Sequence, residues 1–231
     1  MKQLLLLGGM LILLSSYACR SRKAMSSPPP APTGAMEEEA APLEPFEGRL
    51  IYKTKFEDPT NASGGGGVRM LMGNKSVYSI KGARYKSQMN GMFKMMQLYA
   101  GGDTLYSQMR GMNGVFWEDA RQNPDSLIEW SIEKDVTTIM GLSCHVMTIK
   151  AKEGFYQHYY HPSIPADPRL HARHRYGFWA FFIEKTRSLP LKTVLKDGEL
   201  NVEMEVTDIQ RMQLDPAEFA IPAGARIEGV E

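Results

Sequence analysis

A two-residue alternation of apolar and polar side chains constrains the fold of this chain more than any other feature. In LPLKTVLKDGELNVEMEV, residues 189–206, apolar or threonine side chains occupy every second position on each side of the Asp197-Gly198 pair. Because successive side chains of a strand point to opposite faces, this pattern predicts an antiparallel hairpin with one apolar and one wet face. Asp-Gly tolerates the positive φ angles of a two-residue turn, so we place that turn at Asp197-Gly198. Across the wet face, Lys192 or Lys196 is expected to pair with Glu203 or Glu205.

The same period runs through most of residues 46–231, which are long enough to form one domain with a sizeable core. FEGRLIYKTKF, residues 46–56, places Leu50, Tyr52, Thr54 and Phe56 on one face. Further strands are expected at 67–73, 77–82, 84–89, 93–100, 104–110, 114–118, 127–133, 144–151, 155–160 and 176–184. The pattern therefore predicts a mainly antiparallel β domain.

Helices should be few and short, because no stretch carries a sustained apolar stripe at helical spacing. The best candidate is Pro168–Tyr176, and a turn is expected at Asp215–Phe219. GFWAFFIEK, residues 177–185, is apolar on both faces of a strand. Such a strand is typical of the middle of a sheet that is covered on both sides.

The N-terminus has the features of an export signal. Lys2 precedes an apolar run from Leu4 to Leu14, too short for the roughly 20 residues that span a bilayer. Residues 1–18 are therefore expected to be a signal peptide, with small residues before the cleavage point. Cys19 follows at the position that a bacterial lipobox requires, so we favour its lipidation over simple cleavage.

Residues 19–45 are expected to carry the lipid on Cys19 and then act as a disordered tether, because Pro, Ala, Ser and Glu cannot bury enough apolar area to offset ordering. Such a tether has a reach of about 28 Å. If Cys19 is acylated, Cys144, the only other cysteine, has no intramolecular partner and should be buried as a small apolar side chain. A net charge of +1 offers no electrostatic basis for binding nucleic acid.

Three stretches resemble one family of bacterial envelope proteins. TTIMGLSCHVMTIK (137–150) resembles the T-x-x-I-x-G-Y-x-C strand of the group called DUF4412, and VTDIQRMQLDPAEFAIPAGARI (206–227) resembles its ending. FWAFFIEK followed by LPLKT matches the order of its penultimate strands. The chain departs from the family at Leu142-Ser143 and in a long histidine-rich insertion around 162–175.

That family is similar in pattern to lipoprotein carriers of the LolA and LppX type. The resemblance implies a curved, incompletely closed antiparallel sheet around an apolar cavity, with short helices as a lid, and a lipid-binding role. The side chains expected to line that cavity are Leu50, Tyr52, Phe56, Leu191, Leu195, Val202 and Met204. The alternative is that this apolar face packs a dry core.

HYYHPSIPADPRLHARH, residues 158–174, suggests a metal site as an alternative. His158 and His161 would point to opposite faces of a strand, whereas His171 and His174 would share one face of a short helix. A zinc or copper site would also need His161 to fold back beside them. We expect instead a solvated basic loop, since arginines at 169, 173 and 175 would repel a cation.

Methionines suggest a second metal site, because thioethers select Cu(I). The candidates are Met89, Met92, Met95, Met96, Met109 and Met112. The other interpretation is that they pack the core or line an adaptable apolar pocket.

No enzyme motif is present, and Cys144 and His145 would face opposite ways on a strand. We therefore expect a non-catalytic, cofactor-free lipoprotein, anchored in the outer membrane and facing the periplasm, that binds a lipid-like or other apolar molecule. A metal-binding module and an envelope interaction module that binds other envelope proteins are the alternatives.

Overall fold

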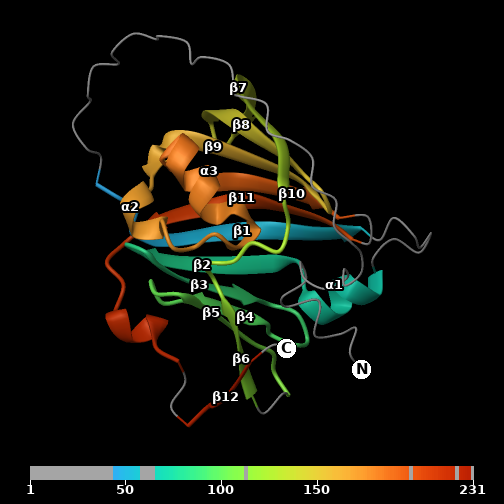
Figure 1. The fold of residues 1–231 in the computed structure, drawn as a ribbon, viewed down its shortest axis with the longest axis vertical. Helices are drawn as coiled ribbons and strands as arrows, with labels where there is room; N and C mark the ends of the chain where they lie inside the picture. The colour runs from blue at the N-terminus through green and yellow to red at the C-terminus, as the bar shows by residue number, and fades with distance from the viewer. Residues whose placement is uncertain (1–43, 58–65, 112–113, 198–199, 222–223, 230–231) are drawn as a thin grey trace, which may run out of the picture.

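A computed structural model describes residues 44–57, 66–111, 114–197, 200–221 and 224–229 (Figure 1). The predicted signal peptide, Cys19 with its predicted lipidation, and nearly all of the predicted tether lie outside these residues. Within the described ranges, no helix is both long enough and apolar enough to cross a bilayer.

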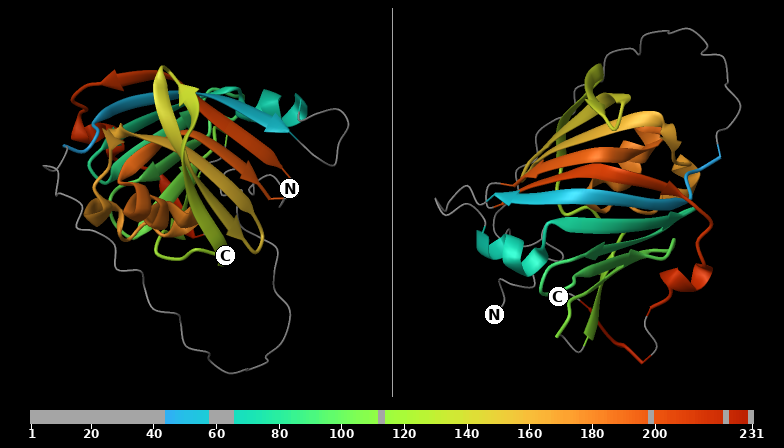
Figure 2. Two further views of the ribbon diagram at one scale, coloured as in Figure 1. Left: turned by 90° about the horizontal axis from the view of Figure 1, so that it is seen from above. Right: turned by 180° about the vertical axis from the view of Figure 1, so that it is seen from behind.

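The described strands form one sheet of 12 strands in the order β12-β6-β5-β4-β3-β2-β1-β11-β10-β9-β8-β7. Every pair is antiparallel except β12 with β6, which is parallel. The sheet is curved and open, with a few short helices (Figures 1 and 2), so the predicted fold class is confirmed. The strands are β1 Gly48–Glu57, β2 Lys75–Lys81, β3 Arg84–Met89, β4 Met96–Tyr99, β5 Thr104–Gln108, β6 Gly114–Asp119, β7 Leu127–Ile139, β8 Leu142–Ala151, β9 Phe155–Pro165, β10 Ser188–Lys196, β11 Asn201–Arg211 and β12 Arg226–Gly229.

The alternation predicted for β1, β10 and β11 is confirmed. In β1 the apolar face is buried and the face with Lys53 and Lys55 is exposed. Lys192 Nζ lies 2.8 Å from Glu205 Oε2 and 3.5 Å from Glu203 Oε1, as expected. The prediction of a two-residue turn is wrong. Lys196 pairs with Asn201, so the four residues 197–200 connect the two strands.

The predicted strand at 67–73 is wrong, since Gly66–Met72 forms helix α1. A helix places Val68 and Met72 one turn apart on the same side. Met72 is buried there against Phe56 and Leu200, with Val68 packed beside them. Helix α1 therefore covers one end of the sheet, where β1 ends and β11 begins.

The predicted central strand at 176–184 is also wrong. Residues Tyr176–Phe178 form a 3-10 turn, η2, and Trp179–Thr186 form helix α3. A short run that is apolar throughout does not distinguish a strand from a buried helix. Here Phe182 and Ile183 are fully buried on the side of the helix that faces the sheet.

The predicted helix at 168–176 is correct only at its start. Helix α2 spans Pro168–His171, and the Asp167 side chain caps it by accepting a hydrogen bond from the Arg169 N–H at 2.9 Å. The chain then turns, and Gly177 and Phe178 both take φ of 60° before α3 begins.

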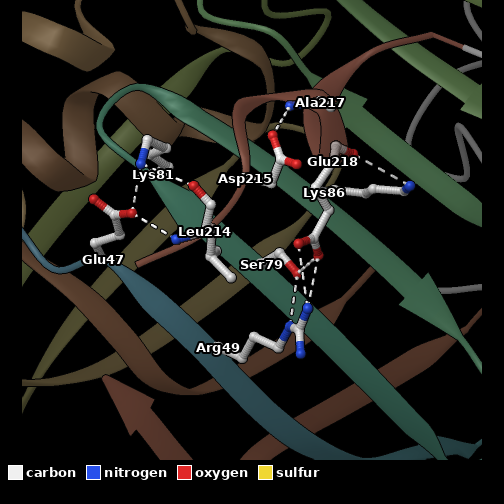
Figure 3. A network of polar contacts seen from close by, with 9 residues as sticks. All are labelled: Glu47, Arg49, Ser79, Lys81, Lys86, Leu214, Asp215, Ala217 and Glu218. Carbon is white, nitrogen blue, oxygen red and sulfur yellow. Dashed lines mark hydrogen bonds and ion pairs between the residues drawn. The ribbon is translucent and has the colours of Figure 1, made fainter. Parts of the chain in front are cut away.

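After β11 the chain crosses the other face of the sheet through the 3-10 turn η3, Pro216–Phe219, where a turn was expected. Leu214 and Phe219 pack there against Met96 and Leu98. Figure 3 shows the polar contacts that hold this segment.

Two carboxylates carry most of these contacts. Glu47 accepts hydrogen bonds from Lys81 Nζ at 2.6 Å and from the Leu214 N–H at 2.7 Å. Glu218 accepts one from Ser79 Oγ at 2.6 Å and pairs with Arg49 at 3.2 Å. The segment that leads to β12 is thus held to the outer side of β1 and β2.

Candidate functional site

The inner face of the sheet is the face on which α3 lies. Phe182 of α3 packs against His158 and Tyr160 of β9, with ring centroids 4.7 and 5.9 Å apart. At the edge strand β7, the ring of Trp130 lies edge-on to that of Phe181, with the ring centroids 5.6 Å apart. Helix α3 therefore covers the β7–β10 part of the inner face.

The segment 168–178, which we call the cap, joins that part to the far side of the sheet. The Ala120 carbonyl, just after β6, accepts hydrogen bonds from the Arg175 and Tyr176 N–H groups at 2.7 and 3.1 Å. The Asn123 side chain accepts one from the Gly177 N–H at 3.2 Å, and Arg173 pairs with Asp103. The cap thus spans from α3 to the β4–β6 hairpins and covers one end of the inner face.

Three histidines predicted to be solvated lie in this covered region, so that prediction is wrong. His158, His171 and His174 are all buried. His174 Nε2 is 2.9 Å from the Tyr85 hydroxyl, and the indole N–H of Trp179 donates to His171 Nδ1 at 3.3 Å. Burial lowers the pKa of His158 and His171 to about 4 and that of His174 to about 3.

The metal alternative gains no support from this arrangement. His161 is half-buried and its Nδ1 lies 2.7 Å from Ser163 Oγ, while His171 and His174 are engaged by aromatic side chains. Across the described ranges, no three His, Cys, Asp or Glu side chains are placed to hold a metal ion.

The methionines do not gather at one point either. Met89 and Met95 pack with the cluster under α1, whereas Met96 lies on the outer face with Leu98. Met92 is exposed, Met109 is buried, and Met112 lies outside the described residues. Packing explains Met89, Met95, Met96 and Met109.

Between the cap and α1, a row of five side chains crosses the inner face. Tyr78, Ser87, Gln97, Ser107 and Phe116 are paired directly across β2, β3, β4, β5 and β6. Ser87 is buried and the other four are half-buried. We call this row, with the half-buried Val202 and Met204 of β11, the inner strip.

The inner strip combines apolar and hydrogen-bonding groups. The Tyr78 ring lies edge-on to Tyr52 at 5.2 Å. The Ser76 hydroxyl donates a hydrogen bond to the Met204 sulfur, with 3.9 Å between oxygen and sulfur. An accessible surface of this kind can contact an apolar body and also satisfy a polar group attached to it.

Most of the side chains predicted to bind a ligand are core residues. Leu50 and Leu191 are fully buried, and Tyr52 donates a hydrogen bond to the Pro190 carbonyl at 2.6 Å. Phe56 packs under α1, and Leu195 is buried in the main core. Of the seven predicted residues, only Val202 and Met204 are half-buried and belong to the inner strip.

The sequence reasoning missed the polar members of the strip and one carboxylate beside it. Glu118 follows Phe116 on the inner face of β6, opposite Leu105. Burial raises its pKa to about 7. Period-two alternation within each strand is the sequence signal that places these residues on the inner face.

Comparisons with known proteins do not identify a family. No family model and no curated protein matches the chain, so the resemblance to DUF4412 stays a prediction. Among solved structures, PNGF-II matches in two crystal forms, with TM-scores of 0.45 and 0.43 at 12% and 11% identity. These matches cover 79% of this chain but 31% of PNGF-II, so the chain spans about a third of that protein. LprF from Mycobacterium bovis matches with a TM-score of 0.30 at 8% identity, over 73% of this chain and 89% of LprF. Likenesses this low do not bear on function.

Proposed function

We propose that this protein is a non-catalytic envelope lipoprotein whose inner strip binds a lipid-like or other apolar molecule. The observation that carries the proposal is the half-buried state of Tyr78, Phe116, Val202 and Met204 on the inner face of a curved, open sheet. A ligand that removes the remaining surface of these apolar side chains from water stabilises the complex by about 25 cal/mol per Å² buried.

The two ends of the inner face support this location. The cap covers one end and α1 covers the other, so the accessible part is limited to the strip between them. A ligand lying across β2–β6 would contact one side chain from each strand. Selectivity would come from shape and from the hydroxyl and amide groups of Ser107 and Gln97.

The proposal includes the anchor. Acylation of Cys19 and the tether at 19–45 would hold the domain near the periplasmic side of the outer membrane, within reach of lipids. The tether and the anchor rest on the sequence pattern alone.

A binding assay with paired variants tests the site. The full chain in a neutral detergent is titrated with the fluorescent apolar probe N-phenyl-1-naphthylamine. Met204→Lys should weaken binding about tenfold, because a charge is placed against the apolar ligand. Val194→Lys is the matched control, since Val194 is half-buried on the outer face of β10, opposite Glu203.

Equal binding by both variants would contradict the site, provided that their melting temperatures show both to be folded. If Met204→Lys does not fold, Phe116→Lys at the other end of the strip replaces it.

One observation favours the interaction-module alternative. Strand β7 is an edge of the sheet and exposes Leu127, Ile128, Trp130 and Val136. A long edge strand with exposed apolar side chains can accept a strand from another protein. Self-association of the ligand-free chain that Trp130→Glu abolishes would support this function instead.

A further inference from the structure

A hollow lies on the outer face of the sheet, the face opposite the inner strip. Its volume is about 440 Å³. It is lined by Lys86, Gln88, Lys94, Met96, Gln108, Met109, Arg110 and Gly111. Lys86 and Gln88 alternate along β3, and the register places Met96 of β4 and Gln108 of β5 on the same face of the sheet. Lys94 precedes β4 and Arg110 follows β5.

The strand register orders these groups. Gln88 is paired with Met96, and Met96 with Gln108, so two amides flank one buried thioether. The Arg110 N–H donates to the Phe93 carbonyl at 2.6 Å, which places Arg110 on the chain segment beside Lys94. Lys94 lies in a tight turn, in which its N–H donates a hydrogen bond to the Gly91 carbonyl at 3.0 Å. Its φ angle there is 40°.

The charge around this hollow is entirely positive. Among the described residues, Lys86, Lys94 and Arg110 line it and no carboxylate does. In the described part of the chain none of these three forms an ion pair. Lys86 donates instead to the Glu218 carbonyl at 3.3 Å, as Figure 3 shows.

Another hollow on the outer face is different. It has a similar volume, about 440 Å³, but Glu133 and Glu205 accompany its single cation, Lys192. Lys192 is already paired with Glu205 at 2.8 Å. That hollow therefore has no free positive charge to attract an anion.

We propose that the hollow at β3–β5 binds a phosphate group, either as a free phosphate or as the headgroup of a phospholipid. Lys86 and Lys94 supply point charges, and the Arg110 guanidinium can donate two hydrogen bonds to two phosphate oxygens. Gln88 and Gln108 can donate to the remaining oxygens. The site is on the opposite face from the inner strip and does not depend on it.

Calorimetric titration of the full chain, in a neutral detergent and a phosphate-free buffer, tests the proposal with two soluble probes. One probe is inorganic phosphate, and the other is glycerophosphoglycerol, the headgroup of phosphatidylglycerol. The test variant is Lys94→Gln/Arg110→Gln, in which both residues are exposed. The matched control is Lys53→Gln/Lys75→Gln. These two exposed lysines are directly paired across β1 and β2 and lie outside the hollow.

We expect saturable binding of at least one probe, weakened about tenfold or more in the test variant and within about twofold of the wild type in the control. Binding of phosphate alone assigns the site to a free phosphate. Tighter binding of glycerophosphoglycerol assigns it to a lipid headgroup. No binding of either probe, or equal weakening in the two variants, would overturn the proposal.

Discussion

Because histidines are buried, acid should destabilise the folded protein. His158 lies under α3, with Nδ1 3.1 Å from Thr193 Oγ1 and its ring 4.7 Å from that of Phe182. Its Nε2 has no hydrogen-bond partner among the residues that the structure describes. Burial therefore favours the neutral ring and lowers its pKa from 6.5 to about 4.

The sign of the pH effect follows from this shift. Between pH 6.5 and about 4 the unfolded chain binds a proton at His158 that the folded chain does not. Stability is thus complete above pH 6.5 and is lost as the pH falls toward 4. Each pH unit below 6.5 lowers the free energy of unfolding by about 1.4 kcal/mol. Between pH 7.5 and pH 5, His158 alone should therefore lower it by about 2 kcal/mol.

Urea unfolding of the full chain at pH 7.5 and pH 5 measures this loss. His158→Gln keeps a polar side chain but cannot bind the proton, so its stability should fall by about 2 kcal/mol less than that of the wild type. His161→Gln is the control, because His161 is half-buried outside the helix-covered core. The reasoning is refuted if His158→Gln loses as much stability on acidification as the wild type.

Three further predictions concern packing and the outer face. Phe182→Ala removes a fully buried ring and should lower the free energy of unfolding by about 3–5 kcal/mol in urea titrations, whereas Phe181→Ala, which is half-buried, should cost less. Glu218→Gln weakens the contacts to Arg49 and Ser79 and should raise amide exchange in residues 214–221, with little change in β8–β9, as hydrogen exchange followed by mass spectrometry can show. Cys144 is buried and its pKa is raised by burial, so it should react with a disulfide reagent only after urea unfolds the chain, and fast reaction of the native protein would contradict its placement.

Local pattern and tertiary context explain what the sequence could predict. Strand faces in β1, β10 and β11 were correct because period-two alternation depends only on neighbours along the chain. Helix α3 was missed because Trp179 to Ile183 is apolar at every position, and only its packing against β9 decides between strand and helix. The wrong turn length at 197–200 arose because Asp197 caps the Leu200 N–H with its side chain rather than starting a two-residue turn.

The candidate site was predictable only in part. Val202 and Met204 were found because they alternate with charged residues. Whether an inner-face residue is covered depends on where the cap and α1 lie, and those segments were assigned wrongly or only in part. The histidines show the same limit, because the contacts that bury His174 come from Tyr85 and Tyr99, far away in the sequence.

Native mass spectrometry of the full chain, purified from a bacterial envelope in a neutral detergent, tests the central claim most directly. We expect a non-covalent added mass of one apolar molecule, separate from any acyl groups on Cys19. This mass should be lost on organic extraction and should be reduced in Met204→Lys but not in Val194→Lys. A chain that carries no such mass, or that carries metal ions in its place, would contradict the claim.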